Sequence, residues 1–420
     1  MVAFESGAEA PVDQRTDSIV RSHQVIFFGD GEKPEPDSVT SRIYEFYYDQ
    51  FRHFQDPLAP YFLFMSKDAN LAMGVGGCVR MRGWYDWGGA VPTTGFAPYM
   101  IPITPDPLKM RDIGTSPAGT ALFFRVLGRN KKLGSYQLYI ETNFNGYASR
   151  DFHLKKAYAM LNDWTVGYTN STFSDPGALP PTVDAQGPNC KMSATSVLVR
   201  WMHAFRHGWS MAASVETPSD QIDVDGISTA KVDQYLPDVA AFVQREWGYG
   251  RHVRLAAVAR TLSYRDLLAG RNHNVVGWGV QLSSVLRPAD PVTVYAAFNG
   301  GCGYAGLGGD WIMGNYDLIG DPDRPGRMKA PGAYGGYAAI QYNFTSSLFV
   351  SATFGGARYL SGRSADPDEY KYGLYGAANL FWDLTPRIQL GAELNVGKRE
   401  NVDGASRWAR RIGAVAQFSF

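Results

Sequence analysis

The chain ends on the stretch Arg411-Ile-Gly-Ala-Val-Ala-Gln-Phe-Ser-Phe420, in which an apolar residue returns at every second position. The even positions from Ile412 to Phe420 are all apolar, whereas the odd positions are small or polar, with Val415 as the exception. An alternation with a period of two is typical of a β-strand that has one apolar face and one polar face. This stretch alone is compatible with a lipid-facing strand and with the edge strand of a soluble β-sandwich.

The same alternation recurs back to residue 71, which favours the lipid-facing interpretation. Short turns alternate with long loops between the strands, as in an up-and-down barrel. About 16 strands are expected, and an even number puts both ends of the barrel on one side of the membrane. They begin at residue 71 and continue at 120–127, 134–144, 151–161, 164–171, 195–205, 209–217, 237–247, 252–264, 274–287, 292–299, 333–344, 348–359, 370–384, 388–399 and the final strand that ends at 420.

The sequence therefore predicts an all-β fold, a transmembrane antiparallel up-and-down β-barrel over residues 71–420. A lipid-facing sheet cannot leave backbone groups unpaired, so the first strand must pair with the last. Aromatic residues near strand ends would form two girdles at the membrane interfaces. These are Trp84, Trp87, Trp164, Tyr168, Trp247, Tyr264, Trp382 and Trp408.

Residues 1–70 are predicted to be an N-terminal extension on the periplasmic side, with a short helix at about 38–51 capped by Ser38. The first 25 residues lack a basic start followed by an apolar segment. We interpret this as a mature or trimmed N-terminus rather than as a sign of a cytoplasmic protein.

Composition restricts the function classes. The chain has 420 residues, 46 Gly and only 19% charged residues, and no apolar run approaches the roughly 20 residues of a transmembrane helix. The formal net charge is zero, which gives no indication of a nucleic-acid partner. Three cysteines are too few for a disulfide framework; Cys190 and Cys302 could pair, but free thiols are favoured.

Strand parity sorts the side chains into lipid-facing and lumen-facing sets, and the lumen set is basic. Rings of Arg and Lys in a pore select anions. Some of these cations could instead pair with inward loop carboxylates, or with lipopolysaccharide phosphates at the rim. Lys156 falls on the lipid parity, which the pattern does not explain. The predicted lumen cations are Arg80, Arg82, Arg125, His153, Lys155, Arg200, Arg254, Arg260, Arg399 and Arg411, against Glu141, Glu216 and Glu393.

No enzyme, cofactor or metal signature stands out. Gly301-Cys-Gly-Tyr-Ala-Gly306 fits a dinucleotide-binding pattern, but Leu-Gly-Gly-Asp follows it and no helix is expected there. The Asp-rich segment 310–323 could bind calcium, although its spacing matches no EF-hand.

Several stretches together resemble the DcaP-like outer-membrane porins. They are Gly167-Tyr-Thr-Asn-Ser-Thr-Phe-Ser, Ala178-Leu-Pro-Pro-Thr-Val-Asp184, Gly187-Pro188, Pro237-Asp-Val-Ala, His252-Val-Arg-Leu-Ala-Ala-Val-Ala-Arg260 and Gly397-Lys-Arg-Glu-Asn-Val-Asp-Gly404. The resemblance covers about residues 71–420 and implies a trimer of sixteen-stranded barrels that passes small anions such as dicarboxylates or aromatic acids. It also implies that the loop after Ser171 narrows the pore, with Asp175 and Asp184 in it. The family's longer N-terminal coiled coil is not seen in this sequence.

The C-terminal aromatics Phe418 and Phe420 resemble the assembly signal of bacterial outer-membrane barrels. The favoured hypothesis is therefore an outer-membrane porin for small, preferentially anionic solutes, in contact with lipid and lipopolysaccharide. The alternative is a barrel with a blocked lumen that serves as a surface-binding or structural protein.

Overall fold

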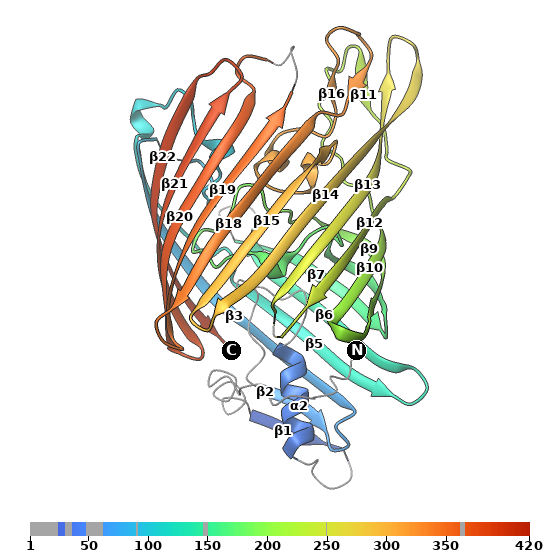
Figure 1. Ribbon diagram of the computed structural model, residues 1–420, viewed down its shortest axis with the longest axis vertical. Coiled ribbons are helices and arrows are strands. Elements are labelled where there is room, and N and C mark those ends of the chain that lie inside the picture. The colour runs from blue at the N-terminus through green and yellow to red at the C-terminus, as the bar shows by residue number, and fades with distance from the viewer. Residues whose placement is uncertain are drawn as a thin grey trace.

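The computed structural model of the protein describes residues 24–29, 36–47, 62–89, 91–145, 150–248, 250–361 and 366–420. Sixteen antiparallel strands close into a barrel, which confirms the predicted fold (Figure 1). The barrel strands are β3 (Leu71–Trp87), β5 (Ala121–Asn130), β6 (Gly134–Asn145), β7 (Asp151–Leu161), β8 (Trp164–Asn170), β9 (Thr195–Ala204), β10 (Trp209–Glu216), β12 (Asp238–Glu246), β13 (His252–Asp266), β14 (Arg271–Ala289), β15 (Val292–Cys302), β18 (Gly332–Asn343), β19 (Leu348–Leu360), β20 (Tyr370–Thr385), β21 (Ile388–Asn401) and β22 (Ser406–Ser419).

The barrel closes where its last strand pairs with its first. Strand β22 runs antiparallel to β3 from Arg410 opposite Trp87 to Ser419 opposite Cys78. Phe420 then exchanges two backbone hydrogen bonds with Gly77, of 2.9 and 3.0 Å. Lipid offers no partner to a free strand edge, so this seam satisfies the backbone groups of both terminal strands.

The apolar residues that alternate along the strands face the outer surface of the barrel. Val79 and Met81 of β3 are about half exposed on that surface, next to Phe418 of β22. Trp164, Trp247, Trp382 and Trp408 are exposed near strand ends, as predicted for the girdles. Two girdle predictions are wrong. Tyr264 is buried, and Trp84 lies on the inward parity of β3, with the guanidinium of Arg411 5.0 Å from its ring.

A β-bulge in β7 explains Lys156. Glu141 of β6 pairs with Lys156, whereas the next residue of β6, Thr142, pairs with Leu154, so Lys155 is the extra residue. One extra residue reverses the parity of the rest of the strand. Lys156 is therefore buried on the inner face, and the assignment to the lipid side was wrong because it assumed unbroken alternation.

The described part of the N-terminal extension lies below the short-turn end of the barrel (Figure 1). It contains β1 (Gln24–Phe28), α2 (Pro36–Tyr47) and β2 (Phe62–Ser66). Strand β2 pairs with β3 just beyond the point where β22 ends, and β1 pairs with β2 in parallel. Helix α2 begins at Pro36, before the predicted cap Ser38, which fits the preference for proline in a first turn. Positions 48–51 of the predicted helix lie outside the described residues.

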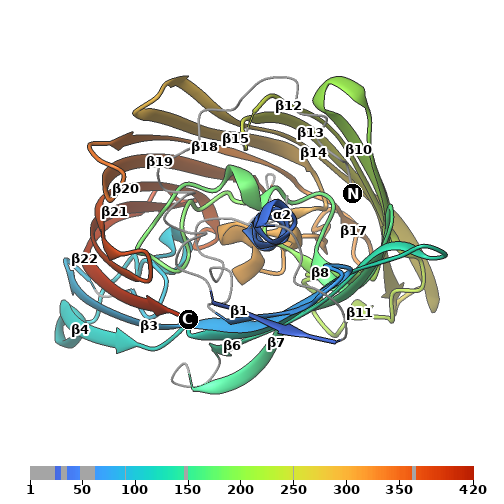
Figure 2. The ribbon, with the colours of Figure 1, turned by 90° about the horizontal axis from the view of Figure 1, so that it is seen from below.

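Hydrophobic packing fixes α2 under the barrel. Ile43 packs with Leu63 and Met65 of β2, Ala72 of β3 and Leu127 of β5. Seen from below, α2 lies inside the outline of the barrel ring (Figure 2). A cavity of ≈ 370 Å³ lies between this helix and the wall, lined by Arg42 together with residues of β5, β6, β7, β9 and β10.

The remaining short elements belong mostly to the long loops at the other end. They are the strands β4 (Arg111–Ser116), β11 (Thr229–Lys231), β16 (Ile319–Gly320) and β17 (Met328–Lys329), and the 3-10 helices η1 (Pro98–Met100), η2 (Pro107–Lys109), η4 (Pro176–Ala178), η6 (Ala305–Leu307) and η7 (Asp310–Met313). Helix η5 (Arg206–Gly208) forms a short turn instead. Within the described ranges, no helix has the length and apolar character that crossing a membrane requires.

Candidate channel constriction

Residues 171–194, which we call the lumen loop, connect β8 to β9 and fold into the barrel, where they form the green segment inside the ring in Figure 2. The loop is closed at its base by a hydrogen bond from the Ser171 amide to the carbonyl of Ala194, of 2.9 Å. Glu216 of β10 then accepts a hydrogen bond from the Thr172 amide, of 2.8 Å. The loop therefore turns inward immediately after β8 ends.

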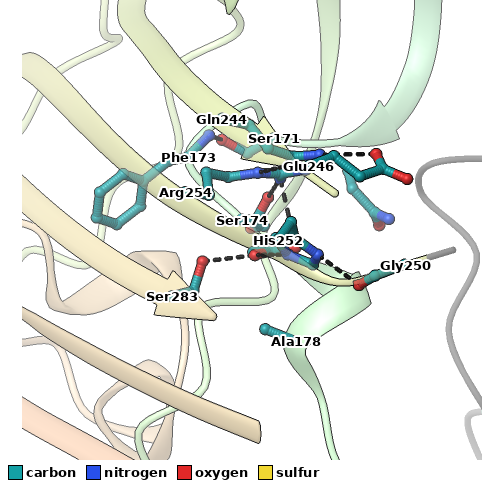
Figure 3. A network of polar contacts seen from close by, with 12 residues as sticks. Ser171, Phe173, Ser174, Ala178, Gln244, Glu246, Gly250, His252, Arg254 and Ser283 are labelled. Atoms are coloured by element: carbon teal, nitrogen blue, oxygen red, sulfur yellow. Dashed lines mark hydrogen bonds and ion pairs between the residues drawn. The ribbon is translucent and has the colours of Figure 1, made fainter. Parts of the chain in front are cut away.

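A buried ionic cluster ties Asp175 of the lumen loop to two strands. One carboxylate oxygen lies 2.9 Å from Nε2 of His252 and accepts a 2.5 Å hydrogen bond from Oγ of Ser283. The other lies 3.5 Å from Nη1 of Arg254. Figure 3 shows the side chains of His252 and Arg254 on β13 and of Ser283 on β14 converging on this part of the loop.

The partners in this cluster have further contacts that hold their orientation. Arg254 also donates to the carbonyl of Ser174 and to Oε1 of Gln244, and its guanidinium lies 4.2 Å from the Phe242 ring. His252 Nδ1 lies 2.9 Å from the carbonyl of Gly250. Burial raises the pKa of Asp175, but Arg254 and His252 outweigh it, and the pKa lies well below its usual range. Asp175 is therefore a charged anchor.

A second anchor lies further along the loop, on the wall formed by β19, β20 and β21. Glu393 of β21 accepts hydrogen bonds from the amides of Val183 and Asp184, both of 2.9 Å. The Pro181 carbonyl accepts from Ser351 of β19 and Asn379 of β20. The backbone from 181 to 184 is thus held by side chains of three adjacent strands.

The lumen loop also contacts the two other long connections inside the barrel. The Asp184 carboxylate accepts from the amide of Phe96, of 2.7 Å, and the Asn189 carbonyl accepts from the amide of Asp310, of 2.7 Å. The Asp310 carboxyl is fully buried, and burial raises its pKa to about 8 although the Tyr99 amide donates to it. Where they meet inside the barrel, around residues 96–99, residues 184–189 and Asp310, the three connections therefore form one packed layer, which we call the loop layer.

Two of the predicted pore arginines meet beside this layer. Arg82 donates to the carbonyls of Val183 and Ala118, at 2.9 and 2.6 Å. Arg80 donates to Oε1 of Gln417 at 2.7 Å. Both guanidinium groups lie over Gly119, where a Cβ would stand 2.9 Å from Nη1 of Arg80 and 3.2 Å from Nη1 of Arg82. The glycine has a φ of +89°, so the close approach and the backbone both require it.

A second group of predicted pore residues lies on β5–β9. Glu141 is fully buried and lies 2.7 Å from Nζ of Lys155 and 3.8 Å from Nζ of Lys156. Arg125 donates to Gln137, and Arg200 donates to the carbonyl of Asn170. His153 differs from the rest, because it is largely exposed near the long-loop end of β7, 4.0 Å from Asp151.

Two further lumen cations are engaged in buried ion pairs. Arg260 of β13 contacts Asp238 of β12 at 2.9 Å and Asp317 of the 303–331 connection at 3.0 Å. Arg411 contacts Asp86 at 2.6 Å. Their positions match the alternative in which inward cations pair with carboxylates. Arg260 thus joins a loop to the wall, which differs from its predicted exposure to an open pore.

Sequence reasoning named Glu216 and Glu393 only as lumen-facing carboxylates, and it did not single out His252 or Ser283. His252, Ser283 and Glu393 lie on the predicted inward parity, and that signal alone could have marked them. Their partners could not be found because contacts between a loop and strands 77 to 210 residues away leave no local pattern. Within the described residues no group of three or more His, Cys, Asp or Glu side chains could hold a metal ion, and the cysteines are free.

Comparison with known proteins supports the fold. No protein-family model and no curated protein sequence matches the chain. Among solved structures, the outer membrane channel DcaP of Acinetobacter baumannii is similar with a TM-score of 0.71 and 20% identity, over 85% of this chain and 99% of that chain.

Two more distant structures share the architecture. The anion-selective porin from Comamonas acidovorans has a TM-score of 0.54 and 10% identity, over 83% of this chain and 100% of that chain. The trimer form of OmpT, an outer membrane protein of Vibrio cholerae, has a TM-score of 0.51 and 11% identity, over 83% of this chain and 99% of that chain. The resemblance to DcaP-like porins is thus confirmed at the level of the fold, which is that of an integral outer-membrane β-barrel of the porin type.

Proposed function

We propose that the protein is a porin for passive diffusion of small hydrophilic solutes and that it prefers anions bearing carboxylates. The observation that carries this proposal is the convergence of Arg80 and Arg82 over Gly119, beside Val183 of the lumen loop. Two adjacent guanidinium groups repel each other, and an anion between them removes this repulsion. A carboxylate also matches the planar, bidentate geometry of an arginine.

The path of the solute follows from the position of the lumen loop. The loop is anchored to β10, β13, β14, β19, β20 and β21, whereas Arg125, Lys155 and Arg200 lie on the wall of β5–β9. We place the anion path along the wall of β5–β9. Glu141 reduces the positive charge of this wall, and His153 lies near the end of the path at the long loops. The arginines are nearly fully covered, so the conductance is expected to be small.

The setting of the channel follows from the same proposal. The long loops face the exterior, the extension over residues 1–70 lies in the periplasm, and the barrel contacts lipid and lipopolysaccharide. We propose a homotrimer, as implied by the resemblance and consistent with the trimer form described for OmpT of Vibrio cholerae. Phe418 and Phe420 act as the assembly signal. The similar structures are a channel, a porin and an outer membrane protein, and we assign no enzymatic activity.

The test is single-channel recording in a planar bilayer under a KCl gradient. The reversal potential should show anion preference, and the triple variant Arg80→Ser/Arg82→Ser/Arg125→Ser should abolish it. A unit charge about 6 Å from a permeating ion in a water-like medium contributes about 0.7 kcal/mol, or roughly threefold in the permeability ratio. A folded barrel without conductance would instead support the blocked-lumen alternative.

A further inference from the structure

The outer wall near the long-loop ends of β19–β22 carries a group of cations on its lipid-facing surface. Arg358 of β19 pairs with Tyr372 of β20, and Tyr372 pairs with Glu400 of β21. Lys398 of β21 pairs with Trp408 of β22. Residues directly opposite each other in a sheet share a face, and Trp408 is 48% exposed. The side chains of this group therefore lie on the outside of the barrel.

These residues form a band at one level. Residues paired directly across neighbouring strands form a row. Because the strands are tilted in Figure 1, these rows are not parallel to the membrane, and residues at the same depth on neighbouring strands belong to successive rows. Arg358, Lys398 and Arg410 lie on successive rows of β19, β21 and β22. The two arginines are three strand spacings apart across the sheet and four residues apart along it, so about 20 Å separates their backbones. Tyr372 and Trp408 lie in the same band, as expected for an interfacial girdle.

The charges of the band are not balanced. Its one carboxylate, Glu400, contacts Lys371 at 3.0 Å and Lys398 at 2.9 Å, and it accepts from the hydroxyl of Tyr372. Arg358 and Arg410 make no side-chain hydrogen bond or ion pair with any described residue. The band therefore presents a net positive charge at the boundary between the apolar wall and the long loops.

We propose that Arg358, Lys371, Lys398 and Arg410 bind the phosphate groups of a phosphorylated glycolipid in the outer leaflet. Cations at the edge of an apolar belt attract anionic headgroups, and guanidinium groups bind phosphate through paired hydrogen bonds. The girdle residues pack against the sugar and the upper acyl chains. The assignment to the outer leaflet rests on the orientation given under the proposed function.

The test uses the full-length protein refolded in detergent, with deep-rough lipopolysaccharide as the probe and microscale thermophoresis as the readout. Each cation near an anionic headgroup contributes about fivefold in affinity, so Arg358→Gln/Arg410→Gln should weaken binding roughly 25-fold. Glu400→Gln removes the carboxylate that contacts Lys371 and Lys398, and it should strengthen lipopolysaccharide binding. The matched control is Arg206→Gln/Arg245→Gln, which removes two exposed cations from the short-turn end and should leave the affinity unchanged.

After phosphatase treatment, the same lipopolysaccharide should have equal affinities for the parent protein and for the double variant. Equal binding of intact lipopolysaccharide by parent and double variant would overturn the proposal. So would a double variant with altered subunit number and unchanged lipid affinity, because the band would then be a subunit contact. Heat-modifiable migration identifies folded barrels; if the double variant fails this check, the gain expected for Glu400→Gln decides the outcome. Conductance recorded on the same samples reports on the porin proposal separately.

Discussion

The buried ionic cluster at Asp175, called the clamp below, gives the most specific prediction about the lumen loop. In Asp175→Ala, His252 and Arg254 lose the carboxylate that they share inside the barrel. Removal of one partner from a buried ion pair costs about 3–5 kcal/mol. The remaining anchors and the barrel hydrogen bonds are untouched, so the loss falls on the attachment of the loop to β13 and β14. It corresponds to a shift of roughly 10²- to 10⁴-fold toward the detached loop.

The assay is hydrogen–deuterium exchange of the peptide that covers residues 171–194, combined with single-channel recording. Asp175→Ala should exchange faster in this peptide alone and should show larger and noisier current steps. The chain offers a matched control in Asp163, which lies 2.7 Å from His203 in a pair that is about two-fifths exposed. Asp163→Ala should change little, because exposed pairs contribute about 0–1 kcal/mol. Unchanged exchange in Asp175→Ala would refute the clamp.

Three further outcomes follow from the structure. Glu141→Gln removes the buried carboxylate beside Lys155 and Lys156, and should raise the anion-to-cation permeability ratio about threefold in reversal-potential measurements. Burial raises the pKa of Asp310 to about 8, so the folded protein binds this proton more tightly than the unfolded chain does. The loop layer should therefore be most stable below about pH 4, and its protection from hydrogen exchange should fall as the pH rises to about 8. Asp310→Asn should show no such pH dependence. Deletion of Phe420 removes two hydrogen bonds at the seam and the proposed assembly signal; the amount of folded protein in outer membranes should fall, and protein refolded in vitro should conduct like the parent.

The barrel could be predicted from the sequence because each strand carries its own evidence. Alternation depends only on which residues face lipid, and it is readable strand by strand, as the stretch ending at Phe420 shows. The prediction failed where one residue broke the period. The bulge at Lys155 moved Lys156 to the inner face, and no composition signal marks such an insertion.

The interior was less predictable because it depends on contacts between distant segments. Parity placed Arg80, Arg260 and Arg411 on the inner face. It also put Arg82 beside Arg80 on the same strand face, but it could not show that Arg260 and Arg411 meet carboxylates. The acidic loop residues were visible in the sequence, but which of them enter the barrel is decided by loop packing.

The most direct test of the central claim is the reversal potential of the parent protein and of Arg82→Ser under the same KCl gradient. Arg82 joins the lumen loop to the wall and lies beside Arg80, so it is the residue on which the anion site depends most. The account predicts an anion-selective parent and a variant with a permeability ratio about threefold closer to unity. A folded parent that prefers cations or passes no current would contradict it.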